Sequence, residues 1–123
     1  MNKEELKNRT KEFALRVIKL VNNLPKTQIG KIVGNQLLRS GTSVGANYRS
    51  ALRARSQVDF EYKLGLVEEE ADESFYWMEL IVESNLMPID KVKNLMQEAN
   101  ELIAIFASAI ISLKKKKITN HKS

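Results

Sequence analysis

The sequence predicts an all-α protein that folds as an antiparallel up-down-up-down four-helix bundle. Its 123 residues suffice for one compact domain, and with only 5 Gly and 2 Pro it lacks the turn residues typical of β-proteins. Apolar residues recur at three- and four-residue spacing in four successive segments. We expect residues 1–113 to form the bundle and residues 114–123 to form a basic, unstructured tail.

The first two helices have clear start and stop signals. The first is expected from Glu4 to Leu24, because Pro25 cannot continue a helix. The second begins after Thr27, whose hydroxyl suits the N-cap position, and extends to about Ala54. A short connection between them favours antiparallel neighbours.

The other two helices follow the same logic. Ser56 with Asp59 three residues later fits the pattern that opens a helix, and this third helix is expected to end at about Asn85. The fourth starts at Pro88, which suits a first helical turn, and its apolar stripe ends at Leu113. Beyond that point come four lysines, which suit the negative end of a helix dipole.

Composition excludes several classes of enzyme. The chain has no Cys, and its only His is His121, so thiolate metal sites and catalytic triads are excluded. The acidic stretch from Glu68 to Glu73 lacks the histidines of di-iron bundles, and we expect its carboxylates to form salt bridges. The sequence therefore predicts no catalytic residue, no metal and no cofactor. With no long uncharged apolar run and a polar, acidic start, it also predicts a cytoplasmic protein without a membrane span.

Charge is strongly segregated along the chain. Residues 13–58 contain no Asp or Glu and carry +8, residues 59–90 carry −9, and residues 91–123 carry +5. At about 100° per residue, four cations share one side of the second helix and a fifth follows it. These candidate polyanion-binding residues are Lys31, Arg39, Arg49, Arg53 and Arg55. The alternative is that the basic and acidic segments lie side by side and neutralise one another.

The second and third helices carry more apolar and small residues than one core stripe needs. Four glycines gather on one side of the second helix, and each costs about 1 kcal/mol relative to Ala in a helix interior. Another chain or an unusually tight neighbour would compensate, unless the helix breaks near Gly41. For the third helix we also expect a subunit interface, although Trp77 could instead widen the core. The candidate interface residues are Leu38, Tyr48, Leu52, Tyr62, Leu66, Trp77 and Leu80.

Two sequence blocks resemble a known family. The first is GNQLLRSGTSVGANY at residues 34–48, followed by RARS at 53–56 and DF at 59–60. The second is EEADES at residues 69–74 with YWMEL at 76–80. Over about residues 10–112 the chain resembles the bacterial intervening-sequence proteins, which are associated with inserts in large-subunit ribosomal RNA genes.

The resemblance implies a four-helix bundle that assembles into a ring-like homo-oligomer, in related proteins a pentamer, without established enzymatic activity. More distant relatives include accessory proteins of diversity-generating retroelements, which bind nucleic acid and a reverse transcriptase through basic surfaces. By analogy, the five cations named above would contact RNA or DNA here.

The leading hypothesis is therefore a non-enzymatic homo-oligomer whose basic helix face and lysine tail contact RNA or DNA backbone without reading sequence. The alternative is a protein-interaction or scaffold module in which the basic stripe of one subunit docks on the acidic helix of the next.

Overall fold

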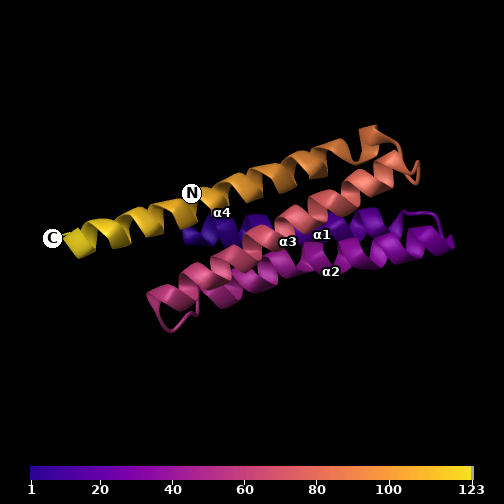
Figure 1. Cartoon of the computed structure of the whole chain (residues 1–123). Coiled ribbons are helices and arrows are strands. Elements are labelled where there is room, and N and C mark those ends of the chain that lie inside the picture. Colours follow the sequence, from indigo (N-terminus) through magenta and orange to yellow (C-terminus); the bar gives the residue numbers. More distant parts are fainter. Residues whose placement is uncertain (123) are drawn as a thin grey trace.

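The computed structural model describes the backbone of residues 1–122 and the side chains of residues 1–119, and within this part of the chain the fold is entirely helical. The elements are α1 (Lys3–Asn22), α2 (Gln28–Ala51), α3 (Gln57–Glu83), the short 3₁₀ helix η1 (Ile89–Lys91) and α4 (Lys93–Lys122). Consecutive helices run antiparallel and lie side by side (Figure 1). The predicted all-α four-helix architecture is confirmed.

The predicted starts of α1, α2 and α3 are also confirmed to within one residue, whereas Pro88 precedes the 3₁₀ helix η1 and α4 begins only at Lys93. The side chain of Thr27 accepts a hydrogen bond from the backbone N–H of Gly30 at 3.1 Å, and Ser56 accepts one from Asp59 at 3.0 Å. Each bond satisfies an amide that has no partner within its own helix. The sequence signals therefore set the beginnings of α2 and α3.

Helices α1 and α3 each end two residues before the expected position, and the ends of α2 and α4 differ more. Helix α2 is continuous through Gly41, but it ends at Ala51, so Arg53 lies in the turn to α3. Helix α4 does not end near Leu113 and continues through the lysines to Lys122. Lysine is a good helix former, so the charged run extends the helix instead of ending it. Of the predicted tail, only Ser123 lies outside the described residues.

Glycines allow α1 and α2 to approach closely along a contact that we call the α1–α2 seam. A Cβ at Gly41 would lie 2.7 Å from Val17 Cγ2, and one at Gly34 would lie 3.2 Å from Leu24 Cδ1. Gly45 likewise faces Thr10 of α1, whereas Gly30 is buried against Pro25 in the α1–α2 turn. The tight neighbour is therefore α1 of the same chain, and the seam needs no second chain.

The core lies along the bundle axis and involves all four helices. Helix α4 packs chiefly against α3 and touches α1 much less. The largest fully buried side chains are Phe13, Val17, Leu37, Val44, Val67, Met78, Ile81, Val92, Leu102 and Phe106.

One end of the bundle differs from the other. At one end lie the α1–α2 turn and the α3–α4 connection. At the other, which we call the open end, lie the start of α1 and the α2–α3 turn, and α4 projects beyond both (Figure 1).

Residues 93–119 of α4 have the length and apolar composition of a membrane span. Core helices of water-soluble bundles meet the same criterion, and α4 directs Leu95, Ala99, Leu102 and Phe106 into the core. The criterion is therefore weak evidence for a membrane.

Candidate functional site

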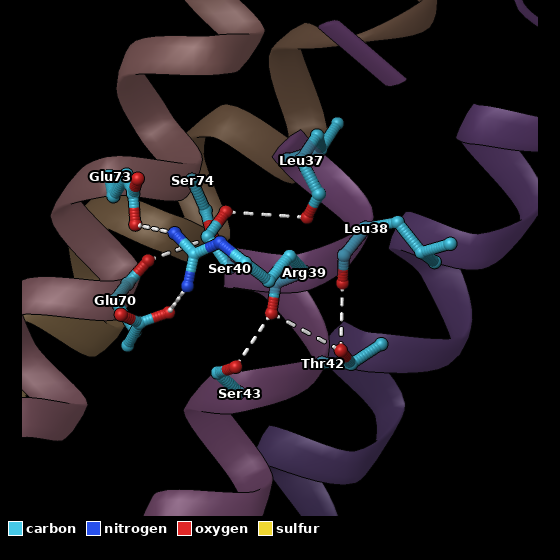
Figure 2. Close-up of polar contacts among 9 residues, drawn as sticks. All are labelled: Leu37, Leu38, Arg39, Ser40, Thr42, Ser43, Glu70, Glu73 and Ser74. Carbon is cyan, nitrogen blue, oxygen red and sulfur yellow. Dashed lines mark hydrogen bonds and ion pairs between the residues drawn. The ribbon is translucent and has the colours of Figure 1, made fainter. Parts of the chain in front are cut away.

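Arg39 lies halfway along α2 and is paired with acidic residues of α3. Its guanidinium donates hydrogen bonds to Glu70, at 3.2 Å, and to Glu73 (Figure 2). The hydrogen bond to Glu73 and the charge of Glu70 raise the pKa of Arg39. The predicted line of free cations along α2 is therefore wrong at Arg39, whose charge is neutralised within the chain.

The hydroxyls around Arg39 also serve the structure. Ser74 Oγ lies 2.9 Å from Ser40 Oγ, and both side chains are buried between α2 and α3 (Figure 2). Thr42 and Ser43 donate to backbone carbonyls one turn earlier, each at 2.7 Å. These groups therefore bond across helices or to their own backbone. None of them has the environment of an activated nucleophile.

Lys31 is separated from the other predicted cations. It is exposed near the α1–α2 turn and lines a shallow groove with Lys26 and Asn35. Arg49 is 18 residues further along α2, at the open end. The candidate residues therefore form no continuous stripe, and Lys31 belongs to a different surface.

Arg49, Arg53 and Arg55 lie together at the α2–α3 turn, with two further cations that the sequence analysis did not select. They line a groove of about 560 Å³ that we call the basic groove. Its cations are Lys7, Arg49, Arg53, Arg55 and Lys63.

A single carboxylate, Asp59, lines the basic groove. It lies 3.3 Å from the ammonium of Lys63 and accepts a long hydrogen bond from the backbone N–H of Arg55. Among the described residues, no carboxylate forms an ion pair with Lys7, Arg49, Arg53 or Arg55. The groove thus concentrates uncompensated positive charge.

Lys7 and Lys63 could have been found from the sequence. In an antiparallel hairpin the beginning of α1 lies beside the end of α2, and Lys63 stands one turn after Asp59 on α3. The signal lies in the topology, since the basic groove joins cations of different helices and no single helix contains the set.

The predicted interface residues fall into two groups. Tyr48 is only 3% exposed and its ring lies 5.3 Å from that of Phe106, so the prediction that it forms a subunit contact is wrong. Leu52 and Trp77 are half-buried against the core. Helices α2 and α3 each pack against two neighbours, which widens their buried face beyond a single stripe.

The remaining residues stay available for contacts. Tyr62 is 65% exposed, and Leu38, Leu66 and Leu80 are half-buried. Trp77 contacts the neighbouring Tyr76 edge to face at 5.1 Å, and its buried indole N–H has no acceptor among the described residues.

An acidic groove lies between α3 and the projecting part of α4. It measures about 830 Å³, and Tyr62 and Leu66 contribute apolar surface to it. Within the described part of the chain, no group of acidic side chains has the arrangement of a metal site. Lys114 and Lys117 also line it, and the carboxylates that line it are Glu61, Glu68, Glu69 and Asp72.

Arg9 is a structural cation that the sequence analysis missed. It donates two hydrogen bonds of 2.7 Å to Glu98 and one of 3.1 Å to Glu101, and so ties α1 to α4. The bonds to Glu98 raise the pKa of Arg9. Arg9 therefore stabilises the fold through ion pairs, whereas Arg49 and Arg53 form none among the described residues.

Comparisons with known proteins agree with this fold. The family model described as 23S rRNA-intervening sequence protein matches residues 2–108 and confirms the resemblance in the two sequence blocks. A crystal structure of a protein of unknown function from the S23 ribosomal protein family of Bacteroides thetaiotaomicron is 35% identical. The alignment has a TM-score of 0.80 and covers 85% of this chain and 96% of that chain. No curated protein matches the chain.

Proposed function

Because the chain belongs to the 23S rRNA-intervening sequence protein family, we propose that it is a non-enzymatic protein that binds RNA or DNA backbone through its basic groove. The observation that carries the proposal is the meeting of five cations, from α1, α2, α3 and the α2–α3 turn, around one described carboxylate. Phosphate groups would relieve the repulsion between these cations and would release the counterions condensed on the nucleic acid.

The neighbouring surface supports this proposal. Lys114, Lys115, Lys116 and Lys117 are exposed on α4 at the same end of the bundle. Lys115 and Lys116 stand away from the carboxylates of the acidic groove and add positive potential at this end of the bundle, whereas Lys114 and Lys117 line the acidic groove. The structural cations Arg9 and Arg39 lie outside this set and remain paired.

The composition of the groove favours binding without sequence preference. Its lining contains arginines, lysines, Ser50, Leu52 and Asp59, and no aromatic side chain. Base stacking, which holds bases in most single-strand sites, has no platform there. We therefore expect contacts to phosphates, which position a strand without identifying its bases.

Fluorescence anisotropy with labelled RNA and DNA oligonucleotides at about 50 mM and about 200 mM salt tests this proposal. We expect binding to both strands and a steep loss of affinity with salt. The combined variant Arg49→Gln, Arg53→Gln and Arg55→Gln should weaken binding by roughly tenfold or more and lower the log–log salt slope by about 2–3 units.

A matched control removes the same charge from the opposite end of the bundle. Lys19, Lys26 and Lys31 are exposed there, and among the described residues they form no ion pair. Replacing all three by Gln should leave affinity nearly unchanged. Absence of binding at low salt, or equal losses in the two triple variants, would refute the proposal.

The acidic groove supports a second candidate function, a scaffold built from several copies of the chain. Its four carboxylates form no ion pair among the described residues, and Tyr62 offers exposed aromatic surface beside them. Lys114 and Lys117 of the same chain offset part of this negative charge, and a basic groove from a neighbouring subunit would complement the rest. The family resemblance makes a pentamer the expected assembly.

Light scattering coupled to size-exclusion chromatography distinguishes the two functions. If subunits pair through these charges, both the triple arginine variant and the combined variant Glu68→Gln, Glu69→Gln and Asp72→Gln should lower the molar mass. If the basic groove serves nucleic acid alone, the arginine variant loses RNA binding and keeps the wild-type mass.

A further inference from the structure

We propose that the open end of the bundle binds an acidic amphipathic helix of a partner protein, in an apolar groove along the projecting part of α4. This site is separate from the basic groove and shares no lining residue with it. The inference does not depend on nucleic-acid binding.

The groove is a continuation of the hydrophobic core that α1 leaves largely uncovered. Its volume is about 650 Å³. Phe106 of α4, Tyr48 of α2 and Leu64 of α3 lie at its base and are almost fully buried. From α1 only Leu6 reaches it. The hydrophobic core therefore opens directly into this groove.

The cause is the unequal length of the helices. Helix α1 begins at Lys3, whereas α4 continues to Lys122 and passes the other helices (Figure 1). The apolar stripe of α4 continues through Ala109 and Leu113, and the α4 lining of the groove extends beyond them to the exposed Thr119. At about 1.5 Å per residue, residues 109–119 span roughly 15 Å, or about three helical turns. A helix of that length would complete the bundle at its open end.

The charged residues that line the apolar groove indicate which kind of partner it can bind. Lys115 and Lys116 line the groove, both are exposed, and no carboxylate of the described residues lines it. Among the described residues neither lysine forms an ion pair. An acidic helix with apolar residues at i, i+3, i+4 and i+7 would cover the apolar floor and pair with both ammonium groups. A nucleic-acid strand would satisfy the lysines and leave the floor exposed to water, so the observations favour a protein helix.

The test uses a synthetic peptide of about four helical turns, with Leu at those four positions and Glu and Ala elsewhere. A peptide of the same composition in scrambled order is the control. Binding to the full-length protein is measured by fluorescence anisotropy. We expect the amphipathic peptide to bind and the scrambled peptide to bind at least roughly tenfold more weakly, since it presents no continuous apolar stripe.

Two apolar residues of one α4 turn give a matched pair of variants. Leu113 lines the groove, whereas Ile111 is 54% exposed and does not. Leu113→Gln should weaken peptide binding by roughly tenfold, and Ile111→Gln should leave it unchanged. The exposed pair Lys115→Gln and Lys116→Gln should also weaken binding, with helicity by circular dichroism unchanged.

Several results would overturn the proposal. One is absence of peptide binding, and another is an equal effect of Ile111→Gln and Leu113→Gln. A lower molar mass in Leu113→Gln would instead assign the groove to a second copy of the chain. If Leu113→Gln weakened RNA binding and not peptide binding, the occupant would be nucleic acid. The triple arginine variant should retain peptide binding, so this proposal and the proposed function can fail separately.

Discussion

The α1–α2 seam and the open end of the bundle are built in opposite ways. At the seam, glycines bring two helices together so closely that a Cβ at Gly41 would lie 2.7 Å from Val17. At the open end, α4 passes the other helices, and both an apolar groove and a basic groove face solvent. The seam is filled by the chain itself, whereas the open end leaves surface of two chemical kinds without a partner.

The difference separates residues needed for folding from residues available for binding. Gly34, Gly41 and Gly45 have their neighbours within the chain, and so have Arg9 and Arg39. Arg49, Arg53 and Lys115 have no ion pair among the described residues. Substitutions in the first group should change stability, and substitutions in the second should change binding.

The largest effect on stability is expected at the seam. Gly41→Ala gains up to about 1 kcal/mol of helix propensity, but its methyl group would overlap the stiff, buried side chain of Val17. We expect a net loss of about 1–3 kcal/mol in the free energy of unfolding, measured by urea denaturation.

Gly65 of α3 is the matched control, because a Cβ there would meet no heavy atom within 4 Å. Gly65→Ala should therefore raise the free energy of unfolding by about 0.5–1 kcal/mol. If Gly41→Ala and Gly65→Ala were equally stable, Gly41 would not pack as closely against Val17 as the structure shows.

A second prediction concerns the contact between Arg9 of α1 and Glu98 of α4, which ties the two helices together. Arg9→Gln removes two hydrogen bonds of 2.7 Å to Glu98, whose side chain is 14% exposed. Leaving a mostly buried carboxylate without its partner should lower the free energy of unfolding by about 1–3 kcal/mol. Lys93 is the control, since its 3.8 Å pair with Asp90 is exposed, and Lys93→Gln should change stability by less than about 0.5 kcal/mol.

A third prediction, with a smaller expected effect, compares Arg39, which forms ion pairs, with Arg53, which forms none among the described residues. Arg39→Gln should lower thermal stability, because Glu70 and Glu73 would then repel each other on α3 without a bridging cation. Its effect should be smaller than that of Arg9→Gln, since half of the Arg39 side chain is exposed to solvent. Arg53→Gln should leave the melting temperature unchanged and reduce RNA affinity. The opposite pattern would show that Arg53 is structural.

Local signals predicted much of the fold. The hydroxyls of Thr27 and Ser56 cap the helices that they were expected to begin, because a cap depends on residues within one turn. The end of α4 was missed because a lysine run is compatible both with a helix and with a solvated tail.

The candidate site was predicted less well because it depends on how helices meet. The pairing of Arg39 with Glu73 requires the register of α2 against α3, which no single helical wheel contains. Tyr48 was assigned to an interface because the wheel of α2 was given one buried sector, whereas α1 and α3 together bury a wider arc. Arg9 pairs with residues about ninety positions away, and no local pattern indicates that contact.

The smallest predicted effect concerns Tyr48 at the base of the open end. Burial raises the pKa of its phenol above the ordinary value of 10.0, because the phenolate would lose solvation beside Phe106. The neutral phenol is therefore favoured in the folded state. Its stabilising contribution is complete below the pKa of the unfolded chain and is lost as pH rises through the higher pKa of the folded protein.

The free energy of unfolding should thus fall more steeply above about pH 10 in the wild type than in Tyr48→Phe, measured by urea denaturation at several pH values. At neutral pH the variant should differ little, because the ring that packs on Phe106 is retained. Equal slopes for Tyr48→Phe and the wild type would mean that water reaches the Tyr48 hydroxyl freely. The apolar groove would then be hydrated down to its base, and an apolar helix would gain less by docking there.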